Sequence, residues 1–265
     1  MKTLSELNAY GEELEARLLL RTSPIAIKML TTEADIPQGA MRPMRDTGSH
    51  LDLCQAFAIS RRERGSVAML KEDHWCYVPV IAHGLAEPPD FYLEGNMDFP
   101  GRIADQQAAK DMAKNSPRLE FGKYIGMVSA PLRKANFQPD LVAIYCNSAQ
   151  LRSLLVGIRY KKGYEVTSTL APGGACVHCT VPVLKTGGCQ VTVPCAGDRR
   201  NALAQDDELI FSVPVHRMED LMAGLKHFDE AGAAYSQLAP AMKNEHPLPG
   251  PYVKMARMIG MDLRE

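Results

Sequence analysis

Seven cysteines are the residues of this sequence whose type and spacing point most directly to chemistry. They are Cys54, Cys76, Cys146, Cys176, Cys179, Cys189 and Cys195. Thiolate sulfur ligates zinc and iron–sulfur clusters, and sets of four cysteines are typical of both. The stretch from 176 to 195 matches neither the paired Cys-x-x-Cys of zinc ribbons nor the tight cysteine run of bacterial ferredoxins. Spacing alone therefore indicates thiol or metal chemistry without choosing between them.

Local sequence separates these cysteines into groups. Cys76 follows Asp73-His74-Trp75, Cys176 follows Gly173-Gly174, and Cys195 stands between Pro194 and Gly197. Glycine lets the backbone bend closely around a bulky group, and exposed turn amides can donate hydrogen bonds to thiolate sulfur. These three positions are therefore the ones where a ligand could approach.

The remaining cysteines carry a weaker signal for chemistry. Cys146 ends an apolar strand and is interpreted as core packing, because free cysteine is among the most buried residue types. For Cys189, which follows a glycine pair, the sequence supports a role in core packing and a role as a metal ligand equally. The sequence assigns no role to Cys179.

Three further side chains are candidates for binding a ligand or cofactor. His178 lies between Cys176 and Cys179, but a haem attachment motif would need histidine, not Thr180, after the second cysteine. Arg199 could clamp a carboxylate or phosphate in bidentate geometry, or form a local ion pair with Asp198 or with Asp206-Asp207. Lys28, on an apolar strand, could point into a pocket or extend to the surface.

Composition narrows the class of protein. The chain has 265 residues and a net charge of −1, so it lacks the positive field of a nucleic-acid-binding protein. Its acid-rich amphipathic N-terminus is unlike a signal peptide, and no window approaches the length of a membrane span. An odd number of reduced cysteines suits the cytoplasm. Nucleotide-binding glycine motifs and the serine-hydrolase motif are absent from the sequence.

The hydrophobic pattern predicts helices alternating with strands. Expected strands cover residues 25–30, 66–70, 124–129, 140–146, 190–193 and 208–213. Expected helices cover residues 3–20, 49–59 with Ser49 as N-cap, 103–114, a segment from Asn147 or Ser148 to about 163, and 218–228. Residues 171–179 and 194–200 are expected to be loops or turns. This order favours an α/β or α+β fold with a mixed sheet flanked by helices. We expect one domain over residues 1–265, with a weak domain boundary near residues 115–120.

A series of segments between about residues 22 and 228 forms a combined pattern. These segments are Ser23-Pro24-Ile25-Ala26-Ile27-Lys28, Cys54, Cys76, Ala130-Pro131-Leu132, Pro139-Asp140-Leu141-Val142, Tyr145-Cys146-Asn147-Ser148-Ala149-Gln150, Cys176, Pro194-Cys195-Ala196-Gly197-Asp198-Arg199-Arg200 and Asp206-Asp207-Glu208. Together they resemble a bacterial and archaeal family called domain of unknown function 169. The resemblance implies one cluster or metal site with four ligands, Cys54, Cys76, Cys176 and Cys195. The family name assigns no activity. This sequence departs from the family pattern after Cys76, where Tyr77-Val78-Pro79-Val80 replaces an early glycine.

Three hypotheses follow. We favour an iron–sulfur protein, with a four-iron cluster, that transfers electrons or handles a small anion held by Arg199 in anaerobic metabolism. The second hypothesis is a metal-free thiol enzyme that uses Cys176 or Cys195. The third is a non-catalytic module that holds structural zinc or binds a ligand. The expected partner is a small molecule or an electron-transfer protein; the substrate, the reaction and self-association stay open.

Overall fold

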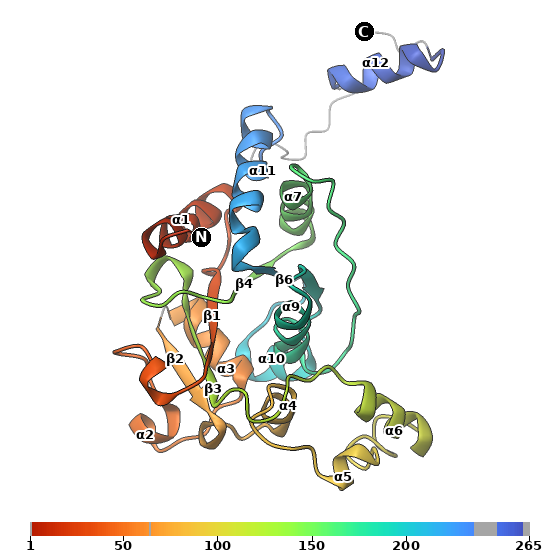
Figure 1. The fold of residues 1–265 in the computed structure, drawn as a ribbon. Helices are drawn as coiled ribbons and strands as arrows, with labels where there is room; N and C mark the ends of the chain where they lie inside the picture. The colour runs from red at the N-terminus through yellow and green to blue at the C-terminus, as the bar shows by residue number, and fades with distance from the viewer. Residues whose placement is uncertain (1, 64, 236–247, 262–265) are drawn as a thin grey trace.

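A six-stranded sheet forms the centre of the part of the chain that this computed structural model describes, residues 2–63, 65–235 and 248–261. The strand order is β2-β3-β1-β4-β6-β5 (Figure 1). The strands are β1 (Ile25–Leu30), β2 (Val67–Leu70), β3 (Gly126–Pro131), β4 (Leu141–Cys146), β5 (Gln190–Thr192) and β6 (Leu209–Pro214). Strands from both sides of residues 115–120 therefore share one sheet.

The expected α+β class is confirmed, but the sheet is not mixed within the described residues, because all its strand pairs are antiparallel. The prediction of a mixed sheet rested on helices alternating with strands, which is typical of parallel crossovers. Here β3 and β4 run in the same direction, but β1 lies between them and pairs antiparallel with both. The N-terminal strand β1 thus separates β3 from β4, which would otherwise form a parallel pair.

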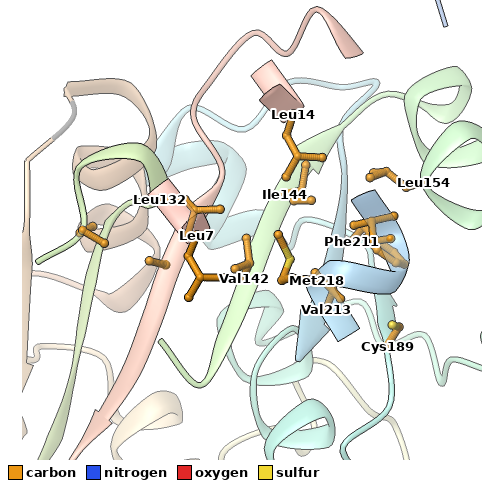
Figure 2. Packing of buried hydrophobic residues seen from close by; sticks show 14 of the residues in the cluster. Leu7, Leu14, Leu132, Val142, Ile144, Leu154, Cys189, Phe211, Val213 and Met218 are labelled. Atoms are coloured by element: carbon orange, nitrogen blue, oxygen red, sulfur yellow. The ribbon is translucent and has the colours of Figure 1, made fainter. Parts of the chain in front are cut away.

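One face of the sheet is covered by α1 (Leu4–Leu18), α7 (Ser148–Arg159) and α11 (Met218–Glu230). Successive strand residues point to opposite faces, so Val142 and Ile144 face these helices, whereas Ala143 and Tyr145 face the other way. Figure 2 shows this first core, in which side chains from α1 and α7 meet those of the sheet.

The opposite face packs against a group of short helices. They are α3 (Leu53–Ala58), α4 (Tyr77–Ala82), α8 (Ala175–His178), α9 (Val181–Thr186) and α10 (Ala196–Ala202). The other helices are α2 (Pro43–Thr47), α5 (Asp90–Leu93), α6 (Gln106–Asn115) and α12 (Gly250–Met258). No helix among the described residues is long and apolar enough to cross a membrane.

Polar side chains fix where the helices begin. The expected cap of α7 is confirmed, because the Asn147 side chain accepts the Gln150 amide. The expected cap of α3 at Ser49 is wrong: Asp52 caps it by accepting the Gln55 amide at 2.6 Å. Leu51 cannot be helical because its amide and carbonyl bond to the Asp73–Trp75 segment. The helix therefore begins after Leu51, and Cys54 falls in its first turn.

Helices α7 and α11 approach each other closely at two glycines. A Cβ added to Gly224 would lie 2.0 Å from the carbonyl oxygen of Gly157. Only a hydrogen atom fits at Gly224, so α11 cannot carry a side chain there without moving α7.

Replacing Gly224 with alanine is expected to lower the free energy of unfolding by about 1–3 kcal/mol, since the methyl group would force the helices apart. Urea denaturation measures this. Gly101→Ala is the control, because no atom lies within 4 Å of its added Cβ; its effect should stay within about 0.5 kcal/mol. Equal stability of the two variants would contradict the packing described.

Candidate functional site

Three cysteines that are far apart in the sequence meet on the face of the sheet opposite α1. Cys54 hydrogen-bonds to the sulfurs of both Cys176 and Cys195. The exposed fractions of these residues are 6%, 5% and 9% respectively, so the contact is almost closed to water. We call Cys54, Cys176 and Cys195 the thiol cluster. These are three of the four residues that the sequence comparison with the family implied as ligands.

Each of the four expected ligands lies at the N-terminus of a short helix. Cys54 and Cys176 lie in the first turns of α3 and α8, and Cys195 and Cys76 are the N-caps of α10 and α4. Helix α3 packs against α8 and α10, and α4 packs against α8. The first amides of a helix lack backbone acceptors and carry partial positive charge. Four such ends near one another favour negatively charged sulfur.

The local sequence explains part of this arrangement. Residues 171–179 and 194–200, which were expected to be loop and turn, instead contain α8 and α10. Gly174 enters α8 with a φ of 65°, a left-handed conformation that favours glycine. Asp198 lies in the first turn of α10, where acidic residues suit the helix dipole. Both helices are too short to leave a periodic signal.

Cys195 is the most acidic thiol of the site. Its pKa is lowered to about 5, first by the hydrogen bond from Cys54 and then by backbone amides of Ala175, Asp198 and Gly197, although burial acts in the opposite direction. These donors stabilise the thiolate. Cys195 is therefore ionised at neutral pH, and the negative charge is held inside the protein.

The neighbouring buried thiols keep their protons. The pKa of Cys54 is raised well above its ordinary value by its hydrogen bonds to Cys176 and Cys195 and by burial. Burial likewise raises the pKa of Cys179, whose sulfur donates to the Cys176 carbonyl at 3.4 Å. Cys54 is thus the donor and Cys195 the acceptor in their hydrogen bond.

Cys76 lies beside the thiol cluster but is held differently. It is half-buried, and its sulfur accepts the backbone amide of Val78, while burial raises its pKa to about 11. Cys176 and Cys195 each raise its pKa electrostatically. The fourth expected ligand is therefore within electrostatic reach of two of the other three and has a separate hydrogen bond.

A buried polar network that the sequence did not predict supports the cluster from the side of the sheet. Asp198 is fully buried, and its Oδ2 accepts the Tyr145 hydroxyl at 2.9 Å. Burial raises the Asp198 pKa to about 7. The Arg61 guanidinium stacks 3.8 Å above the Tyr145 ring and pairs with Glu208 at 3.2 Å. The only sequence signal for this network is the Gly-Asp-Arg-Arg motif, and that motif points to its arginines rather than to its aspartate, Asp198.

His83 joins α4 to the segment that follows Cys179. Its two ring nitrogens each lie 2.8 Å from an oxygen, one from the Pro79 carbonyl and one from the Thr180 hydroxyl. Burial lowers the pKa of His83 to about 4, so the ring is neutral at pH 7. Because a carbonyl can only accept, Nδ1 carries the proton. The Thr180 hydroxyl beside Nε2 also donates to the Cys176 carbonyl at 2.7 Å.

The other candidate side chains lie in different places. His178, at the end of α8, is half-buried near Cys195, and burial lowers its pKa. Lys28 alternates with Ile27 and Met29 along β1, so it belongs to the face of the sheet opposite the thiol cluster. Arg199 is 55% exposed and pairs with Asp206. Of the three, only His178 adjoins the sulfurs.

Two cysteines serve packing on the other face of the sheet. Cys146 belongs to the first core, as predicted, and so does Cys189. Figure 2 shows Cys189 beside Val213 in this core. Burial raises the pKa of both thiols to about 12, which leaves them protonated and unreactive at neutral pH.

Across the described ranges, no group of three or more His, Cys, Asp or Glu side chains is arranged to hold a metal ion. The thiol cluster is thus a set of sulfurs in hydrogen-bonding contact, with Cys76 to one side. The structure thus provides buried sulfur atoms that could act as metal donors, with backbone amides around them.

Comparisons with known proteins give a family but no activity. The family described as uncharacterised ArCR, domain of unknown function 169, matches residues 13–224. An uncharacterized protein of Methanocaldococcus jannaschii is 23% identical over 228 residues, which cover 85% of this chain and 96% of that protein. No solved structure matches the chain.

Replacing Cys54 with alanine is expected to raise the pKa of Cys195 above about 5, because the thiolate loses its largest stabilising donor. The rate of Cys195 alkylation by iodoacetamide, followed against pH by mass spectrometry on reduced, chelator-treated protein, measures this. Cys189→Ala, on the other face of the sheet, should leave the midpoint in place. An unchanged midpoint in the Cys54 variant would show that the hydrogen bond does not act as described.

Replacing Asp198 with asparagine is expected to raise the free energy of unfolding of the metal-free protein above that of wild type, and to do so more at pH 8.5 than at pH 4.5. The folded-state pKa of this carboxyl, about 7, lies above its ordinary value of 3.8, so its favourable contribution is complete below about 4 and is lost as pH rises through 7. Full loss of this contribution lowers the free energy of unfolding by about 4 kcal/mol. The neutral amide of asparagine does not ionise and so avoids this loss.

Urea denaturation of both proteins at the two pH values measures this effect. Exposed Asp111→Asn is the control and should follow the wild-type pH dependence. If Asp198→Asn also followed it, the carboxyl would not be carrying the expected charge.

Proposed function

The chain belongs to the family called domain of unknown function 169, and from that premise we propose that it binds an iron–sulfur cluster through Cys54, Cys76, Cys176 and Cys195. One observation carries the proposal: cysteines from three distant segments, Cys54, Cys176 and Cys195, meet in hydrogen-bonding contact. Core packing alone does not require thiols at these positions, and cysteine thiolates are the usual ligands of such clusters.

The electrostatic surroundings suit an anionic, thiolate-ligated group. Removing charge from water is unfavourable unless hydrogen bonds compensate it. Here backbone amides of Ala175, Gly197, Asp198 and Val78 already donate to sulfur. Hydrogen bonds to sulfur and solvent exposure are also what set the reduction potential of iron–sulfur clusters. The amides that hold the thiolate in the metal-free chain would thus tune the bound cluster.

The proposed role is redox. Four cysteines satisfy both two-iron and four-iron clusters; we propose the four-iron form, and iron content per chain distinguishes the two. Electron transfer or presentation of the cluster to a small substrate follows from this chemistry. The surface ion pair of Arg199 with Asp206 gives no support to an anion site at that arginine. The proposal also places the chain in a reducing compartment.

Metal and sulfide analysis after anaerobic purification tests the proposal. We expect about four irons and four sulfides per chain, with charge-transfer absorption in the visible range. Cys54→Ser, Cys176→Ser and Cys195→Ser should each lose most of the iron. Cys146→Ser and Cys189→Ser are matched controls on the other face of the sheet and should keep it. An iron-free wild-type protein, purified and reconstituted without oxygen, would refute the proposal.

A second function, metal-free thiol chemistry, is favoured by the acidity of Cys195. A thiolate with a pKa of about 5 beside the protonated thiol of Cys54 resembles the attacking and resolving pair of thiol–disulfide exchange. Cys176 is the other nucleophile within reach of Cys54. Iron-free protein in which Cys195 alkylates fastest supports this function, and stoichiometric zinc indicates a structural metal instead.

A further inference from the structure

We infer that α12 of one copy of this chain docks on the α5–α6 pair of a second copy, so that two copies form a closed, reciprocal dimer. The inference concerns self-association and does not depend on the proposed iron–sulfur function. It joins two exposed apolar surfaces that carry opposite charge.

The first observation is the exposed apolar stripe of α12. Tyr252, Met255 and Ile259 are spaced three and four residues apart, so they lie on one side of the helix. They are 72%, 58% and 65% exposed respectively. A helix of nine residues is marginal in water unless its apolar face packs against another surface. The stripe therefore requires a partner surface.

The second observation is the charge of this segment, which excludes one apolar surface of the body. The charged residues among 248–261 are Lys254 and Arg257, so the segment is cationic. A groove of about 250 Å³ along α7 has an apolar wall at Leu155, but Arg152 and Arg159 also line it. Like charges brought together at an interface oppose binding. The α7 groove is therefore a poor seat for α12.

The α5–α6 pair offers the opposite charge. Phe91 in α5 is 58% exposed, and the exposed residues Glu87 and Asp90 precede it. Among the described residues neither carboxylate forms an ion pair. Met97 and Phe99, which follow α5, are 40% and 37% exposed. This segment thus combines exposed apolar side chains with unpaired carboxylates, which suits a cationic, apolar helix.

The α5–α6 pair is also a packed unit that can serve as a fixed surface. Glu94 pairs with Lys110 at 2.5 Å. A Cβ added to Gly95 would lie 2.5 Å from the backbone nitrogen of Lys110, so the end of α5 lies directly against α6. A surface that is ordered before binding loses little conformational freedom when a helix docks on it.

Chain geometry favours a second copy over the same copy. Figure 1 shows the end of α11 and the α5–α6 pair at opposite ends of the molecule. Residues 236–247 can span at most about 45 Å when fully extended. A compact chain of this length is itself about 45 Å across, and the path over its surface is longer. Two copies side by side in opposite directions bring each α12 to the α5–α6 pair of the other, and twofold symmetry closes the assembly.

Sedimentation equilibrium of the full chain at about 0.1 M salt, where charges act over about 10 Å, tests the inference. We expect a wild-type dimer with a Kd in the micromolar range. Lys254→Glu and Asp90→Lys should each weaken it at least about tenfold, because like charges then face each other at both docking contacts. Arg152→Glu, in the α7 groove, is the control and should leave the Kd unchanged. Circular dichroism verifies that each variant is folded.

Mixing the two weakened variants shows whether docking occurs between copies. In a heterodimer of Lys254→Glu with Asp90→Lys, both docking contacts pair opposite charges again. The mixture should therefore dimerise with about the wild-type Kd, although each variant alone dimerises weakly.

Three outcomes would overturn the inference. A monomeric wild-type chain is the first. The second is a dimer that either substitution leaves intact, since another surface would then hold it. The third is a pair of weakened variants that do not recover on mixing, which would place α12 on its own chain. None of these results bears on iron content, which tests the proposed function separately.

Discussion

The hydrogen bond from Cys54 to Cys195 is the largest interaction that stabilises a buried sulfur anion on this face of the sheet. A sulfur anion inside a protein needs donors, and here they come from one thiol and from amides at the starts of α8 and α10. Those amides are available because the helices begin at this point. The first turns of α4, α8 and α10 thus supply backbone amides to sulfur.

Long elements and the fold class could be predicted from sequence, because they leave a periodic pattern. The strand at 25–30 and the cap at Asn147 agree with the structure, since apolar runs and capping side chains act locally. The all-antiparallel pairing could not be predicted, because it depends on the insertion of β1 between β3 and β4. That choice is made by long-range packing rather than by any local residue.

The candidate site was predictable in its residue types but not in its geometry. Glycine and proline around Cys176 and Cys195 correctly indicated close backbone approach, but helices as short as α8 and α10 have no periodicity to detect. Asp198 was overlooked because a carboxylate in a polar stretch is usually solvated. Only the fold shows that it is fully buried and bonded to Tyr145.

The sheet also divides the cysteines into two populations. Cys146 and Cys189 lie in one core, and the thiol cluster lies in the other, with a layer of backbone between them. Disulfide geometry demands Cα atoms within about 7 Å of each other, and the faces of a sheet direct side chains apart. In air, cross-links within the folded chain are therefore confined to cysteines on the same face of the sheet. Oxidation of the thiol cluster would leave the packing on the other face unchanged.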